Sequence, residues 1–204
     1  AADASYTIAV DGVSWLRSGP TFINLDGKRH STTDGSLKLD GLVETNGVDR
    51  RLGAYHGWEA KWRASSVEFT TSIRRHADNA TLSFRTTFPS GVKATGALAS
   101  SWNELLTSFP SFAMGPRPGS SHNGTTLGYL TFSGRFIEAS RAGPWDGTGG
   151  AQLPGGASAG PFALFERRAA AAVVVSPFDN FMSSSFSRCK HSLTICCVSN
   201  GLIT

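Results

Sequence analysis

The stretch that decides the fold is Val67-Glu68-Phe69-Thr70-Thr71-Ser72-Ile73-Arg74, in which apolar side chains fall mainly on odd positions and polar ones on even positions. This period of two is typical of a strand with one buried and one solvated face. Leu82, Phe84 and Phe88 repeat the pattern after a turn around Asp78-Asn79. The two segments therefore predict an antiparallel hairpin.

The chain before this hairpin is divided by pairs of residues that favour tight turns. Asp-Gly and Asn-Gly pairs accept the positive φ angles of such turns, so the region reads as short antiparallel strands, predicted at 6–10, 21–25 and 36–39. The pairs are Asp11-Gly12, Asp26-Gly27, Asp34-Gly35, Asp40-Gly41 and Asn46-Gly47.

Length and composition favour one large β domain. The chain has 204 residues, enough for a sizeable core, and only 17% of them are charged, against about 25% in an average domain. Ser101-Trp102-Asn103-Glu104 fits a helix-capping box, but Pro110 would end that helix near Ser108. We therefore predict an all-β, antiparallel β-sandwich over 1–186, with at most one or two short helices.

The last segment, 187–204, differs from this body. It holds all three cysteines, Cys189, Cys196 and Cys197, so the body cannot depend on internal disulfides. Their spacing does not match a zinc site, and we predict no metal and no cofactor. The segment reads as an atypical tail, either a truncated or mis-spliced continuation or a terminal edge strand. We expect the main core to be complete without it.

Charge and hydropathy argue against nucleic-acid and membrane partners. The net charge is +4, but basic residues occur singly or in pairs such as Arg50-Arg51 and Arg167-Arg168, with no basic stripe. No apolar run approaches the roughly 18 residues that span a bilayer.

Two features predict a secreted or lumenal glycoprotein. The sequence starts at Ala1, as after removal of a signal peptide. The triplets Asn79-Ala80-Thr81 and Asn123-Gly124-Thr125 are acceptor sequons for glycans, each flanked by turn-forming residues.

Tryptophans supply the candidates for carbohydrate binding. Trp58 and Trp62 share one face of an extended segment, where they form either part of the core or a sugar-stacking platform. Trp145-Asp146 lies in a glycine-rich tract, 143–160, and a tryptophan in such a loop is less readily explained as core. The carbohydrate-binding candidates are thus Trp145, Asp146, Trp58 and Trp62.

Catalytic motifs are absent from the sequence. The five histidines are scattered, no G-x-S-x-G elbow occurs, and no pair of carboxylates is nominated by a local motif. Asp179 is the strongest single carboxylate, but turn chemistry after Pro177 explains it more simply. We identify no catalytic residue.

Five short sequence motifs, considered together, characterise the body of the chain. They are Ser18-Gly19-Pro20-Thr21-Phe22, Leu52-Gly53-Ala54-Tyr55, Ser108-Phe109-Pro110-Ser111-Phe112, Gly160-Pro161-Phe162-Ala163-Leu164-Phe165 and Ser176-Pro177-Phe178-Asp179-Asn180-Phe181-Met182. Their order resembles the N-terminal β-sandwich of large secreted proteins related to raffinose synthases and α-galactosidases. In that group a mutarotase-like supersandwich precedes a catalytic (β/α)₈ barrel that carries the carboxylates, so no catalytic residue carries over to this chain.

The resemblance implies a non-catalytic accessory domain of a glycoside hydrolase-like enzyme, with a downstream catalytic domain and a carbohydrate as partners. A free-standing extracellular carbohydrate-binding module and a purely structural extracellular domain remain the alternatives. The module would present Trp58, Trp62 or Trp145 at its surface.

Overall fold

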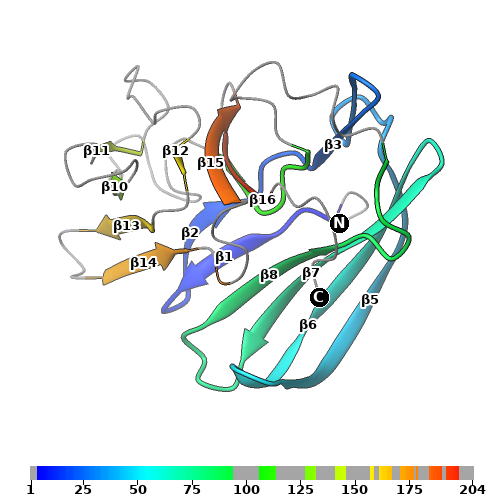
Figure 1. Cartoon of the computed structure of the whole chain (residues 1–204). Coiled ribbons are helices and arrows are strands. Elements are labelled where there is room, and N and C mark those ends of the chain that lie inside the picture. The colour runs from blue at the N-terminus through cyan, green and yellow to red at the C-terminus, as the bar shows by residue number, and fades with distance from the viewer. Residues whose placement is uncertain are drawn as a thin grey trace.

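The computed structural model describes residues 4–93, 106–113, 127–131, 141–145, 157–158, 161–166, 171–176, 178, 184–189 and 192–197. Within these ranges the chain forms strands, turns and connections, and no helix (Figure 1). Every described strand pairing is antiparallel. The all-β prediction is confirmed. Of the short helix expected near Ser101, residues 101–105 lie outside the described ranges and 106–108 are not helical.

The largest element is a four-stranded sheet in the order β5-β6-β7-β8, which runs as a curved layer across the lower right of Figure 1. Its strands are β5 (Lys38–Asp49), β6 (Gly53–Ala64), β7 (Val67–His76) and β8 (Leu82–Thr87). β7 and β8 are the hairpin that the alternating pattern predicts, with Ile73 opposite Phe84.

Turn chemistry correctly predicts the first two hairpins of the chain. Asp11-Gly12 and Asp26-Gly27 take positive φ at both residues and join β1 (Thr7–Val10) to β2 (Val13–Arg17) and β3 (Phe22–Leu25) to β4 (Lys28–Ser31).

The turns predicted at Asp40-Gly41 and Asn46-Gly47 are wrong, because both pairs lie inside β5. Pairing along the length of β6 holds β5 extended, and a register shift between Leu39 and Gly41 absorbs Asp40. Gly47 lets the Tyr55 ring lie flat against the strand, since a Cβ there would come 2.9 Å from the Tyr55 hydroxyl oxygen.

The remaining strands form two further four-stranded sheets, in the orders β11-β10-β13-β14 and β12-β15-β16-β9. The strands are β9 (Ser111–Ala113), β10 (Gly128–Thr131), β11 (Arg141–Pro144), β12 (Ala157–Ser158), β13 (Phe162–Glu166), β14 (Ala171–Val175), β15 (Ser184–Cys189) and β16 (Ser192–Cys197). Face-to-face packing of two large sheets, as in a β-sandwich, stays a prediction.

Two clusters of buried side chains form the core. One lies over one end of the large sheet and the other joins β2 to β9, β10 and β13. The first contains Ile23, Leu25, Leu37, Ala60, Trp62, Ala64, Phe69 and Leu106. The second contains Trp15, Leu16, Phe112, Leu127, Tyr129, Trp145, Phe162 and Leu164.

The tail contributes a strand to a sheet of the body. β16 pairs with β15 on one side and with β9 on the other, where Leu193 lies opposite Phe112. Phe112 is 1% exposed and belongs to the second core cluster. The segment 187–204 therefore supplies β16 and the end of β15, as a terminal strand would.

This pairing predicts that the tail stabilises the domain. Deleting 187–204 removes the β-sheet partner of β9, leaves its backbone groups unpaired and loosens the packing around Phe112, so we expect the free energy of unfolding to fall by about 2 kcal/mol or more. Urea denaturation measures the change. Deleting only 199–204, beyond β16, is the control and should leave the midpoint unchanged. An unchanged midpoint after the longer deletion would show instead that the body is complete without its tail.

Candidate functional site

Trp58 lies where the core stops covering the large sheet. Trp62, Ala60 and Ala64 point to the same face of β6 and are buried, whereas Trp58 is 48% exposed. Ala60, Trp62 and Ala64 belong to the first core cluster. The remaining part of an apolar face is therefore left open at Trp58.

Two polar side chains hold the open tryptophan in place. Glu44 lies opposite Trp58 on β5, and His56 precedes it by two residues on the same face of β6. The His56 ring meets Trp58 edge-on, with centroids 5.2 Å apart and planes at 82°. His56 Nε2 lies 2.5 Å from Glu44 Oε1. We call Glu44, His56 and Trp58 the Trp58 platform.

The platform combines a half-exposed indole ring with two hydrogen-bonding side chains beside it. The side chains of His56 and Glu44 are 43% and 64% exposed, so solvent and ligands reach both. An aromatic face offers apolar contact to the C–H side of a sugar ring, while a carboxylate and an imidazole can bond its hydroxyls. This arrangement suits the binding of a carbohydrate.

The same geometry does not suit glycoside hydrolysis. That reaction usually needs two carboxyl groups about 5–10 Å apart, one with a raised pKa to act as the acid. The platform has one carboxylate, and the nearby Asp40 carboxylate accepts a hydrogen bond from Arg63 Nη2 at 2.8 Å. Within the described ranges no group of three or more His, Cys, Asp or Glu residues is placed to hold a metal ion.

The aspartates whose pKa values are lowered stabilise turns of the backbone. Hydrogen bonds lower the pKa of Asp34, Asp49 and Asp78 below the usual range, chiefly bonds from the Ser36 side chain, the Arg51 backbone and the Thr81 side chain respectively. A lowered pKa keeps each carboxyl group ionised, which stabilises its turn and is the opposite of what a general acid requires.

Two of the tryptophan candidates are core residues. Trp62 is 3% exposed, donates from Nε1 to Thr71 Oγ1 at 2.8 Å and stacks on Phe69. Trp145 is 2% exposed, its backbone N–H donates to the Leu127 carbonyl at 2.6 Å, and its ring packs against Phe162.

Neither Trp62 nor Trp145 thus offers a ring face to a sugar in this structure. Trp145 directly follows β11, whose pairing with β10 brings it into the second core cluster. Asp146 lies outside the described residues.

The first sequon lies at the tip of the β7–β8 hairpin, as its sequence context predicts. Asn79 is exposed and has a positive φ of 56°. The Asp78 carboxylate fixes the turn by accepting hydrogen bonds from Ala80 N at 3.0 Å and from Thr81 N at 2.9 Å. Asn123 lies outside the described residues.

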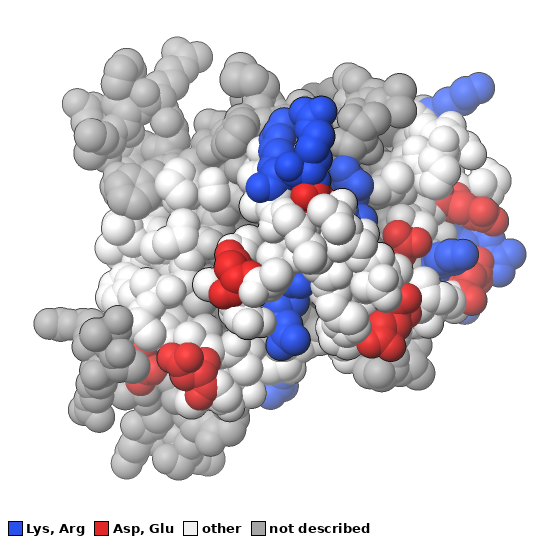
Figure 2. Space-filling view, turned by 90° about the horizontal axis from the view of Figure 1, so that it is seen from below, with Lys and Arg blue, Asp and Glu red and all other residues white. Residues whose placement is uncertain are grey.

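Charged and apolar side chains both reach the surface of the molecule. Figure 2 shows basic and acidic side chains interspersed on one face, separated by wide uncharged areas. By register, Leu42, Val48 and Leu82 share the sheet face of Trp58, and they are 46%, 79% and 38% exposed. Among the described residues we find no helix long and apolar enough to cross a membrane.

Sequence reasoning missed Glu44 and His56. The signal that would have found them is register: a single turn at Asp49–Gly53 places Glu44 opposite Trp58. The turn predicted at Asn46-Gly47 would end the strand there, so the sequence alone did not predict the pairing of Glu44 with Trp58.

Comparison with models of known protein families, with curated protein sequences and with solved structures gave no match.

The two tryptophans of β6 should differ sharply in their effect on stability. Trp62→Ala leaves a cavity and removes a buried hydrogen bond, so it should lower the free energy of unfolding by about 3–5 kcal/mol. Trp58→Ala, at a half-exposed position on the same strand face, should cost about 1 kcal/mol or less. Urea denaturation of both variants checks this, and equal losses would show that Trp58 is a structural residue.

Proposed function

We propose that this chain is a non-catalytic accessory β domain of a glycoside hydrolase-like enzyme, which binds carbohydrate through the Trp58 platform. The observation that carries the proposal is the half-exposed Trp58, in T-shaped ring contact with His56, which in turn contacts Glu44. An exposed ring fixed in this way loses little side-chain freedom when a sugar stacks on it.

The apolar side chains beside the platform support a neighbouring domain. Leu42, Val48 and Leu82 are exposed on the same sheet face as Trp58, with polar side chains such as Asn46 and Arg75 between them. A face that mixes apolar and polar side chains in this way suits contact with another domain. We propose that a downstream catalytic barrel packs beside Trp58 and so positions the platform near its substrate. The motifs that resemble raffinose synthase and α-galactosidase relatives support the same arrangement.

A second candidate is a free-standing carbohydrate-binding module. The specific observation in its favour is that Glu44, His56 and Trp58 come from β5 and β6 alone, so the platform needs no residue from another domain. Both candidates include a secreted or lumenal location. The exposed Asn79 at a hairpin tip supports this location, because a glycan there would project into solvent.

Carbohydrate binding is tested on the isolated chain with a panel of oligosaccharides and insoluble polysaccharides. Trp58→Ala should weaken binding about 5- to 30-fold, because it removes one stacking contact. Isothermal titration measures the soluble ligands and pull-down the insoluble ones. Val174→Ala is the matched control, since Val174 is an apolar side chain that is 64% exposed on another sheet. Unchanged affinity in Trp58→Ala, or a parent chain that binds none of the panel, would refute the platform.

The isolated chain should be catalytically silent. Aryl α- and β-glycosides and raffinose-type oligosaccharides should show no turnover above background, because the Trp58 platform has one carboxyl group and the reaction usually needs two. Glu44→Gln and Asp179→Asn are assayed beside the parent. Turnover in the parent that disappears in either variant would make this chain an enzyme in its own right.

A further inference from the structure

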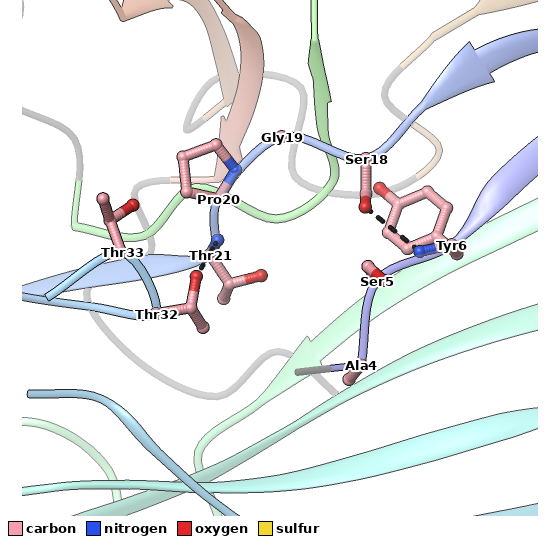
Figure 3. Close-up of a pocket in the computed structure, with 9 residues that line it drawn as sticks. All are labelled: Ala4, Ser5, Tyr6, Ser18, Gly19, Pro20, Thr21, Thr32 and Thr33. Atoms are coloured by element: carbon pink, nitrogen blue, oxygen red, sulfur yellow. Dashed lines mark hydrogen bonds between the residues drawn. The ribbon is translucent and has the colours of Figure 1, made fainter. Parts of the chain in front are cut away.

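A cavity of about 260 Å³ lies near the N-terminus, apart from the Trp58 platform (Figure 3). Its walls come from three segments: residues 4–6 before β1, residues 18–21 between β2 and β3, and residues 32–33 after β4. Six of its nine lining residues carry a hydroxyl group: Ser5, Tyr6, Ser18, Thr21, Thr32 and Thr33. The segment 18–21 belongs to the motif Ser18-Gly19-Pro20-Thr21-Phe22.

Two reciprocal hydrogen-bonded pairs fix the walls. On one side Ser18 N donates to the Tyr6 carbonyl at 2.9 Å and Tyr6 N donates to Ser18 Oγ at 3.0 Å. On the other, Thr32 N donates to the Thr21 carbonyl at 3.0 Å and Thr21 N donates to Thr32 Oγ1 at 3.3 Å. Figure 3 shows the two side-chain bonds on opposite sides of the opening.

Further hydrogen bonds tie the segment between these walls to residues far along the chain. Gly19 N donates to the Ser111 carbonyl at 2.9 Å, and Ser108 Oγ donates to the Pro20 carbonyl at 2.9 Å. The lining is therefore held in position before any ligand arrives, which lowers the entropic cost of binding.

The fixed hydroxyls keep hydrogen-bonding capacity for a ligand. A hydroxyl oxygen that accepts one backbone N–H retains its O–H proton and a second lone pair. This applies to Ser18 Oγ and Thr32 Oγ1. In Figure 3 the Thr21 hydroxyl points away from Thr32, toward the side of the cavity that Ser5 lines. The cavity thus presents both donors and acceptors.

The lining carries no charge. Apart from the Tyr6 phenol it contains no ionisable side chain. Burial raises the pKa of that phenol, and its hydroxyl donates to the Ser111 carbonyl at 3.2 Å, so it stays neutral. An ion entering this cavity would lose water without meeting an opposite charge, which is costly. A neutral ligand with several hydroxyls exchanges hydrogen bonds with water for bonds with the lining.

We propose that this cavity is a second binding site, which takes one neutral polyhydroxylated unit such as a single sugar residue or a free polyol. Its volume lies just below that of most ligand pockets, which span about 300–1,000 Å³, so it suits one small unit and not a longer chain. The site recognises its ligand by hydroxyl contacts, whereas the platform uses a ring face. The proposal does not depend on the Trp58 platform.

The test is a titration of the full chain, followed by NMR and by thermal unfolding, with neutral monosaccharides and their methyl glycosides, free polyols, and the charged analogues glucuronate and glucosamine. Neutral compounds should bind and raise the melting temperature, since a ligand of the folded state stabilises it. The charged analogues should bind at least about 10-fold more weakly. The glycosides and the free polyols distinguish a glycan end from a soluble polyol as the natural ligand.

Thr21→Val is the decisive variant, because it removes the Thr21 hydroxyl while both wall bonds use only the backbone of Thr21. Loss of one hydrogen bond should weaken binding about 3- to 10-fold. Thr45→Val, the same substitution on β5, is the control. In Trp58→Ala the ligands should still shift the NMR signals of the cavity residues as in the parent, which separates this site from the platform. Equal affinity in Thr21→Val and the parent, no binding by the parent, or equal binding of the charged analogues would overturn the proposal.

Discussion

The contact on which the rest of the structure depends is a cluster of four aromatic rings, Tyr6, Phe84, Phe109 and Phe112. Phe84 lies 6.0 Å from Tyr6 and 5.9 Å from both Phe109 and Phe112, measured between ring centroids, mostly in edge-on geometry. Phe84 comes from β8 at the edge of the large sheet, Tyr6 precedes β1, Phe109 precedes β9 and Phe112 lies in β9. Each such aromatic pair contributes about 0.5–1.5 kcal/mol beyond its buried area. Together they join the large sheet to the N-terminal hairpins and to the second core cluster.

This junction explains why the two candidate sites have different characters. The large sheet packs against the first core cluster near Trp62 and against the aromatic cluster through Phe84, whereas Trp58 on the same face is half exposed. The cavity is lined by Tyr6, whose ring belongs to the aromatic cluster. The backbone N–H of Tyr6 donates to Ser18 Oγ, which also lines the cavity. A site on an open sheet face recognises a ligand by stacking. A site enclosed by backbone and hydroxyl groups recognises it by hydrogen bonds.

The cavity and the junction share Tyr6. Its ring packs on Phe84, while its backbone N–H donates to Ser18 Oγ and its hydroxyl donates to the Ser111 carbonyl.

The sequence by itself determined the features that depend on neighbouring residues. The alternation from Val67 to Arg74 determines a strand, and Asp11-Gly12 and Asp26-Gly27 determine tight turns, because each acts through local backbone geometry. Tertiary pairing decided the rest. It kept Asp40-Gly41 and Asn46-Gly47 extended inside β5, since a long ladder with β6 outweighs the preference of a dipeptide.

The sequence placed Trp58 and Trp62 on one face, but only the reach of the covering core decided that Trp62 is buried and Trp58 is open. It read Trp145 as a loop residue, whereas strand pairing drew it into the core. The cavity had no sequence signal, because its hydroxyls come from three separate segments that only the folded chain brings together.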